Sequence, residues 1–208
     1  TESQRNNVYT NNVREEETLP ITQRSVFQGY KRSDGGVGTR NYVGIVTSVN
    51  CTASAAKLLV KEAEKSGILD QFPGVDGIVP IVHGAGCCIG TNDEAFRKLQ
   101  RAIWGYATHP NFASVLMLGL GCESNQIPAM LEAYGRQQDD AFQYFTLQSE
   151  GGTKKSIEKG LIWLETALKI ANKAVREPVD VSHLSVALQC GGSDGYSGIT
   201  SNPALGHA

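Results

Sequence analysis

The sequence contains no hydrophobic run approaching the roughly 18 residues that a membrane-spanning helix needs. It has no cluster of Lys and Arg interleaved with aromatic residues, and its formal net charge is only −2. We therefore expect neither nucleic acid nor membrane as a partner. The first residues include no hydrophobic signal segment, so the expected location is cytoplasmic.

Several cofactor motifs are also missing. No Cys-x-x-Cys pair occurs, which argues against a zinc ribbon. No Gly-x-Gly-x-x-Gly loop follows the first predicted strand, which disfavours a dinucleotide cofactor. The Gly-rich turn around residue 85 is not followed by Gly-Lys-Ser/Thr, so it does not match a P-loop.

The chain has 208 residues, of which 40% are hydrophobic and 19% charged, enough for a packed core. Residues 1–25 are polar and without periodicity, and we expect a flexible arm or linker there. Residues 26–208 are expected to form an α/β domain. The chain starts without Met and stops after a turn that precedes a helix, so we expect a fragment of a longer enzyme.

Short apolar runs alternate with segments of helical spacing along this domain. The runs predict strands at 42–49, 75–82, 113–120, 141–147 and 184–188. The helical segments are 53–65, 93–106, 128–134 and 154–176. This alternation predicts an α/β fold with a doubly wound, mostly parallel sheet of about five strands and helices on both faces.

Cysteines follow four of these predicted strands. They are Cys51, Cys87, Cys122 and Cys190. The carboxyl ends of parallel strands form one edge of the sheet, which is where ligands bind in open α/β folds. In the cytosol such thiols are reduced, so their placement favours a site over a disulfide framework. Taken singly, each cysteine is also consistent with a small buried hydrophobic residue.

Other reactive groups lie in the same turns. His83 and Cys87 are four residues apart in a Gly-rich turn, where both can reach a metal or substrate. An anion-binding nest, or a histidine bonded to the backbone, is an alternative. Glu123 after the third strand is either a ligand or general base, or a carboxylate facing the start of a helix. The hydroxyl-rich turn at 189–203 suits a polyhydroxylated carboxylate, unless it is a plain loop.

Four long motifs resemble the altronate dehydratase/galactarate dehydratase family, over residue 27 to the end of the chain. They are GYKRSDGGVGTRNYVGIVTSVNC (29–51), HGAGC (83–87), HPNFASVLMLGLGCESNQ (109–126) and QCGGSDGYSGITSNPALG (189–206). The resemblance implies a hydro-lyase that removes a proton beside the carboxylate of a sugar acid. The neighbouring hydroxyl then leaves, which gives a 2-keto-3-deoxy acid. It also implies a divalent metal, usually Fe(II), and this chain as the central part of the enzyme.

The resemblance and the turn chemistry together give a predicted site. The predicted catalytic residues are Glu123, Asp194 and His83. The predicted metal ligands are His83, Cys87, Cys122 and Cys190. The predicted substrate-binding residues are Asn50, Cys51, Asn125, Ser193, Ser197, Thr200 and Asn202. Because several of these residues are thiols, an iron–sulfur cluster is the alternative to mononuclear Fe(II).

The predicted function is a sugar-acid dehydratase acting on altronate or a related aldonate or aldarate. A small sugar acid is the expected ligand, and we expect a homo-oligomer. A sulfolactate sulfo-lyase-like enzyme, a non-catalytic sugar-acid binding or assembly module, and a thiol redox protein are the alternatives.

Overall fold

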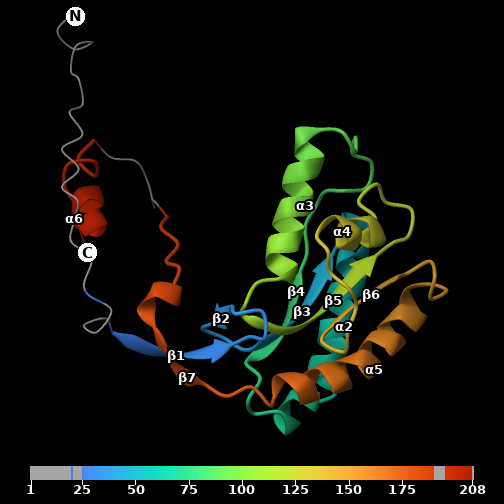
Figure 1. Ribbon diagram of the computed structural model, residues 1–208. Helices are drawn as coiled ribbons and strands as arrows, with labels where there is room; N and C mark the ends of the chain where they lie inside the picture. The colour runs from blue at the N-terminus through green and yellow to red at the C-terminus, as the bar shows by residue number, and fades with distance from the viewer. Residues whose placement is uncertain (1–19, 21–24, 190–194, 208) are drawn as a thin grey trace, which may run out of the picture.

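The computed structural model describes residues 20, 25–189 and 195–207. Its centre is a four-stranded parallel sheet with the order β4-β3-β5-β6 (Figure 1). In chain order these strands are β3 (Tyr42–Thr47), β4 (Gly77–Ile81), β5 (Phe112–Gly119) and β6 (Phe142–Thr146). They correspond to the first four predicted strands. We call the edge where they end the carboxyl edge and the edge where they begin the amino edge.

Helices cover both faces of this sheet, as predicted (Figure 1). The helices are α2 (Ala53–Lys65), α3 (Glu94–Ala107), α4 (Ile127–Ala133) and α5 (Thr153–Ala171). Along β5, Leu116 and Leu118 pack into the core with α2 and α5, while Val115 and Met117 pack into the core with α3 and α4. Successive strand residues point to opposite faces, so an unbroken apolar strand supplies both cores.

A small antiparallel sheet lies outside the sequence prediction. It has the order β2-β1-β7 and is formed by β1 (Val26–Lys31), β2 (Val37–Gly38) and β7 (Glu177–Asp180). Arg176 stacks over the Tyr30 ring at 4.6 Å and donates hydrogen bonds to Gln28 O (2.8 Å) and Thr39 O (3.0 Å). These contacts join the two ends of the α/β unit.

Helix α5 ends at Ala171, five residues before the end of the predicted helix 154–176. Ala171 O accepts a hydrogen bond from Asn41 Nδ2 (2.8 Å), and Asn172 Oδ1 accepts one from Gly74 N (2.8 Å). The chain then becomes extended as β7, because residues 177–180 pair with β1. Contacts from the distant residues Asn41 and Gly74 therefore mark the end of α5, and the last five residues of the predicted helix lead into β7 instead.

The predicted fifth strand at 184–188 is wrong for this sheet. These residues belong to no strand, and Leu184, Val186 and Leu188 are all exposed. The reason is the preceding β7, which binds β1 and leads the chain away from the four-stranded sheet. After a short turn, η4 (Val181–His183), the chain runs to α6 (Ser201–His207), which lies apart from the sheet in Figure 1.

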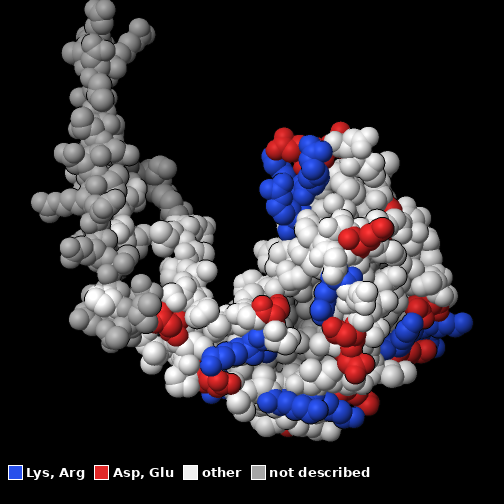
Figure 2. Space-filling model, viewed as in Figure 1, with Lys and Arg blue, Asp and Glu red and all other residues white. Residues whose placement is uncertain are grey.

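Charged side chains are distributed in small mixed groups. On the face shown in Figure 2, Lys and Arg lie beside Asp and Glu. Examples are Lys98 with Glu94 (2.8 Å) and Lys159 with Glu150 (2.6 Å). Among the residues described, no helix is both long and apolar enough to cross a membrane.

Candidate functional site at the carboxyl edge

Three loops meet at the carboxyl edge of the four-stranded sheet. They follow β3, β4 and β5 and comprise residues 48–52, 82–93 and 120–126. Asn50 N donates to Ala85 O (2.9 Å), which joins the first two loops. The Ser48 hydroxyl donates to Glu123 Oε1 (2.7 Å), which joins the first and third. Three of the four strand ends predicted to form the site are therefore neighbours in space, and the fourth, at 184–188, is not a strand.

Glu123 anchors the third loop. Its side chain is only 4% exposed, and it accepts hydrogen bonds from Leu120 N (3.1 Å) and Gly121 N (2.6 Å) as well as from Ser48. Charge-assisted bonds of this kind are stronger than neutral ones and compensate the cost of burying a carboxylate. The predicted base thus already has three hydrogen-bond donors and holds the loop after β5 in place.

Two glycines make this anchoring possible. A Cβ at Gly119 would lie 2.5 Å from Glu123 Oε1, so a side chain there would displace the carboxylate. Gly121 has a φ of 120°, which disfavours any residue with a side chain. The glycines of the Gly119–Gly121 turn therefore allow close approach of the backbone to Glu123.

The thiols of Cys51 and Cys87 lie next to each other at this edge, one from each of the first two loops. Both residues are exposed and neither is in a disulfide. The hydrogen bond with Cys51 is the main cause that raises the pKa of Cys87, and the negative charges of Cys51 and Glu123 raise it further. The fold thus brings together Cys51 and Cys87, two predicted site residues that are 36 positions apart in the sequence.

His83 uses both ring nitrogens in bonds to the main chain. Nδ1 accepts a hydrogen bond from Ala85 N (3.2 Å), and Nε2 lies 3.1 Å from Thr47 O. The accepting role of Nδ1 assigns the ring proton to Nε2, which then donates to the carbonyl. His83 therefore fixes the turn after β4 against the end of β3, in the backbone-bonded arrangement that the sequence left open.

Cys122 and Asn125 differ in accessibility. Cys122 is exposed, and its Sγ accepts a hydrogen bond from Gln148 Nε2 (3.4 Å). Asn125 is fully buried and donates to Ser48 O at 3.5 Å, while its Oδ1 has no partner among the residues described. Asn125 therefore lies beneath the loops, and direct contact with a substrate would require them to open.

The described residues do not assemble a ligand set for iron. Within them, no group of three or more His, Cys, Asp or Glu side chains surrounds a common point. The carboxylate oxygens of Glu123 and both ring nitrogens of His83 are engaged in hydrogen bonds within the protein. Residues Cys190, Ser193 and Asp194 of the predicted site lie outside the described part of the chain.

The remaining predicted substrate residues do not reach the carboxyl edge in the described structure. Ser197 and Thr200 precede α6, and Asn202 lies within it. The Thr200 hydroxyl donates to Tyr196 O (3.0 Å), a local bond that supports the start of the helix. Because α6 lies apart from the sheet in Figure 1, these residues are not joined with Cys51 and Cys87.

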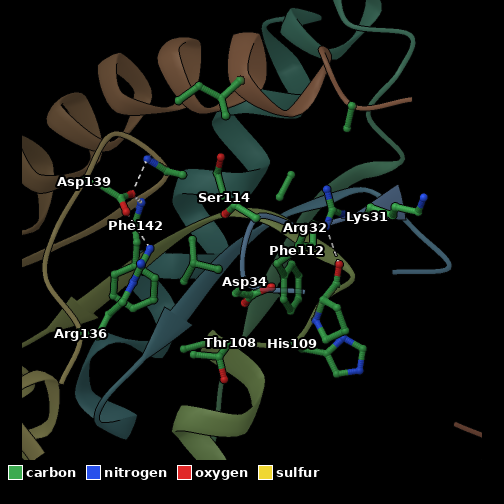
Figure 3. A pocket seen from close by; sticks show the side chains of 18 residues that line it. Lys31, Arg32, Asp34, Thr108, His109, Phe112, Ser114, Arg136, Asp139 and Phe142 are labelled. Carbon is green, nitrogen blue, oxygen red and sulfur yellow. Dashed lines mark hydrogen bonds and ion pairs between the residues drawn. The ribbon is translucent and has the colours of Figure 1, made fainter. Parts of the chain in front are cut away.

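A cavity of about 440 Å³ lies at the amino edge, opposite the predicted site (Figure 3). Its charged groups are bound within the protein. Arg32 donates to Pro110 O, Asn41 Oδ1 and Arg40 O, and burial lowers its pKa. In Figure 3, Arg136 lies over Phe142 and bonds to Asp139 (2.8 Å). We therefore place the candidate site at the carboxyl edge, where exposed thiols and the usual ligand position of α/β sheets coincide.

The sequence interpretation missed two residues of this edge. Ser48 holds Glu123, and Gln148 binds Cys122. Both had a usable signal, because Ser48 lies at the end of the predicted strand 42–49 and Gln148 directly follows the predicted strand 141–147. In an α/β sheet, polar residues at the carboxyl ends of strands indicate site residues as cysteines there do.

The fold and these loops define an open α/β domain with reactive groups at the carboxyl edge of a parallel sheet. Residues 29–172 match the family described as D-galactarate dehydratase/Altronate hydrolase, second domain. Residues 181–208 match D-galactarate/Altronate dehydratase, C-terminal. The chain therefore belongs to the galactarate dehydratase/altronate dehydratase family, which confirms the resemblance found in the sequence.

Named relatives agree with this membership. The chain is 33% identical to altronate dehydratase of Bacillus subtilis (strain 168), over 96% of its own length and 39% of the relative. It is 38% identical to galactarate dehydratase (L-threo-forming) of Escherichia coli (strain K12), over 92% of its length and 38% of the relative. A more distant relative, at 29% identity over 88% of the chain and 42% of the relative, is (2R)-sulfolactate sulfo-lyase subunit beta of Chromohalobacter salexigens. The chain thus spans about two fifths of the length of these relatives.

Proposed function

We propose that this chain is the central part of a sugar-acid dehydratase that converts altronate, or a related aldonate or aldarate, to a 2-keto-3-deoxy acid. Family membership supports the reaction class. The observation that carries the location of the site is the meeting of Cys51, Cys87 and the Glu123-anchored loop at one sheet edge. Reactive groups from three adjacent strand ends are thereby available to one small ligand.

Asn50 is the polar residue best placed to bind the substrate. It is exposed, and its Oδ1 accepts a bond from Cys51 Sγ (3.5 Å). The Asn50 Nδ2 group makes no hydrogen bond within the described residues, so it remains a donor for a carboxylate or hydroxyl. Neighbouring Cys51 and Cys87 would then contact the carbon chain of the sugar acid.

Of the three predicted catalytic residues, only Asp194 remains a candidate for the general base. The donor and acceptor atoms of His83 and Glu123 are engaged with the protein itself. We assign proton abstraction to Asp194, which stays a prediction because it lies outside the described residues. His83 and Glu123 act as positioning residues that hold the loops after β4 and β5.

The expected Fe(II) or iron–sulfur cluster also stays a prediction. A divalent metal would supply charge stabilisation to the enolate that forms when the α-proton leaves. Among the described residues no three possible ligands surround a common point, so the predicted ligand Cys190 and other parts of the enzyme would have to contribute if a metal is bound. Iron and sulfide analysis of the anaerobically purified longer enzyme tests this expectation: one iron without sulfide indicates a mononuclear site, and matched iron and sulfide a cluster.

Two histidines offer a matched test of the site. His83 and His109 each accept a hydrogen bond from the backbone N–H two residues later (3.2 and 3.1 Å). They lie at opposite edges, because His83 follows β4 and His109 precedes β5. We expect His83→Ala to lower kcat/KM for altronate or galactarate by about 100-fold through loss of loop positioning. His109→Ala removes a similar local bond and should leave activity near that of the parent.

Keto-acid formation by the longer enzyme is the measurement, with altronate, galactarate and sulfolactate as parallel substrates. No product from either sugar acid with metal-loaded enzyme would overturn the proposed function. Equal losses in the two histidine variants would instead show that the carboxyl edge is not the site. Release of sulfite from sulfolactate alone would favour the second candidate, a sulfo-lyase, which the 29% identity to such an enzyme subunit supports.

A further inference from the structure

We propose that Cys51 and Cys87 form a site of reversible oxidation, at which a peroxide converts the two thiols to a disulfide. Both residues are exposed, so an oxidant reaches them from solvent. They follow different strands, β3 and β4, in loops that the hydrogen bond from Asn50 N to Ala85 O (2.9 Å) holds side by side. This inference concerns the thiols alone and does not depend on the dehydratase reaction.

Main-chain contacts hold the two thiols together. Asn50, the residue before Cys51, donates from its backbone N–H to Ala85 O (2.9 Å). A Cβ at Gly86, the residue before Cys87, would lie 3.1 Å from Ser48 O and 3.5 Å from the Cα of Val49. The two cysteine-bearing segments therefore run side by side. Residues 82–93 contain no helix or strand, so small adjustments toward disulfide geometry need not break regular structure.

The chemistry balances with one peroxide per site. One thiolate attacks hydrogen peroxide, its sulfur is oxidised to a sulfenic acid, and the O–O bond breaks with release of water. The second thiol then attacks that sulfur, the S–S bond forms, and a second water leaves. The pair loses two electrons and two protons, and the peroxide takes up both.

Other described cysteines are less suited to this pairing. Cys88 directly follows Cys87 in the chain, and the side chains of adjacent residues do not point toward each other as a disulfide requires. Cys122 Sγ instead accepts a hydrogen bond from Gln148 Nε2 (3.4 Å). Cys88 is nevertheless exposed, so it provides a matched control with the same access to oxidant.

The test is mass spectrometry of this chain after brief exposure to hydrogen peroxide. Free thiols are blocked by alkylation, the protein is digested without reduction, and cross-linked peptides are identified. We expect one main cross-link, between Cys51 and Cys87, that disappears on treatment with dithiothreitol. Cys51→Ser and Cys87→Ser should abolish the cross-link. Cys88→Ser should retain it, and its free thiols should disappear at a rate within about two-fold of the parent rate.

The parent protein alone decides the outcome, so the test does not depend on the folding of any variant. The inference is overturned if both thiols stay fully alkylatable, if oxidation ends in sulfinic acids, or if the main cross-link joins other cysteines. A second measurement uses the longer enzyme, where the disulfide would tie together loops of the proposed substrate site. Absence of dehydratase activity there would count against the proposed function and leave the disulfide result intact.

Discussion

At the scale of single residues, the environment of Glu123 separates two roles that its sequence position leaves open. The loop after β5 depends on one buried carboxylate with three donors. One of these donors, Ser48, is 75 positions away in the sequence. The pairing of β3 with β5 brings Ser48 to Glu123, and no local sequence pattern around Glu123 predicts this contact.

Replacing this carboxylate should destabilise the fold. Glu123→Ala leaves the Ser48 hydroxyl and two backbone N–H groups without their acceptor, and we expect a loss of about 2–4 kcal/mol in the free energy of unfolding. Urea denaturation of the purified chain measures it. Glu94→Ala, which removes an exposed ion pair with Lys98 on α3, is the control and should cost about 0.5 kcal/mol or less. Equal losses in the two variants would contradict the anchoring role.

The thiol pair gives a second prediction at this scale. Cys51→Ala removes the hydrogen bond and charge that raise the pKa of Cys87, so that pKa should fall toward its ordinary value. A lower pKa increases the thiolate fraction at a given pH, and alkylation of Cys87 should reach its half-maximal rate at a lower pH than in the parent. The pH dependence of iodoacetamide labelling, followed peptide by peptide, measures this shift. The Cys88 profile should not move, and an unchanged Cys87 profile would show that the thiols do not interact.

At the scale of elements, the packing of α2 against α5 depends on one glycine. A Cβ at Gly160 of α5 would lie 2.7 Å from Leu59 Cδ2 and 3.0 Å from its Cδ1. Leu59 is buried in the shared core, so it has little room to move. Glycine in a helix interior is unfavourable by itself, and here close approach of two helices compensates that cost.

A pair of glycine-to-alanine variants tests this packing. Gly160→Ala should destabilise the chain by about 1–2 kcal/mol, because overpacking exceeds the gain in helix propensity. Gly105→Ala, in α3 where no atom lies within 4 Å of the added Cβ, should stabilise it by about 0.5–1 kcal/mol. Thermal or urea unfolding of both variants provides the comparison. A Gly160→Ala variant as stable as Gly105→Ala would mean that the helices are not in close contact there.

At the scale of the whole molecule, β7 lies between two units. The match to the second domain of the family ends at residue 172, and the match to its C-terminal part starts at 181. Between them, β7 pairs with β1, and Arg176 stacks on Tyr30. Beyond this junction, Val186 and Leu188 are 72% and 66% exposed. Alternating apolar residues of this kind suit a strand, and the relatives extend well beyond the length that this chain matches. In an enzyme of the relatives' length, we expect residues 184–188 to pair with a further strand.

Hydrogen exchange tests this expectation. In this chain the amides of 185–189 should exchange rapidly, since these residues belong to no helix or strand. In the longer enzyme the same amides should be protected. The strand β7, which pairs with β1, serves as the control and should be protected in both forms. Rapid exchange of 185–189 in the longer enzyme would show that the segment is a true loop.

Much of the fold follows from the sequence because its signals are local. The apolar runs and helical spacings fixed four parallel strands and the helices that alternate with them, and α2 covers the same residues as its predicted segment. β1, β2 and β7 escaped prediction because they are short, partly polar and stabilised by pairing between distant residues. Contacts with the distant residues Asn41 and Gly74 likewise mark the early end of α5.

The sequence by itself determined the family, the four strands of the parallel sheet and the edge at which the reactive groups gather. Strand ends and long motifs are read along the chain, so they need no tertiary information. Only the tertiary structure decided which groups meet: Cys51 with Cys87, Ser48 with Glu123, and His83 with the carbonyl of Thr47. Those contacts join different strand ends, and whether a carboxylate or imidazole is free for chemistry depends on the hydrogen bonds that such neighbours supply.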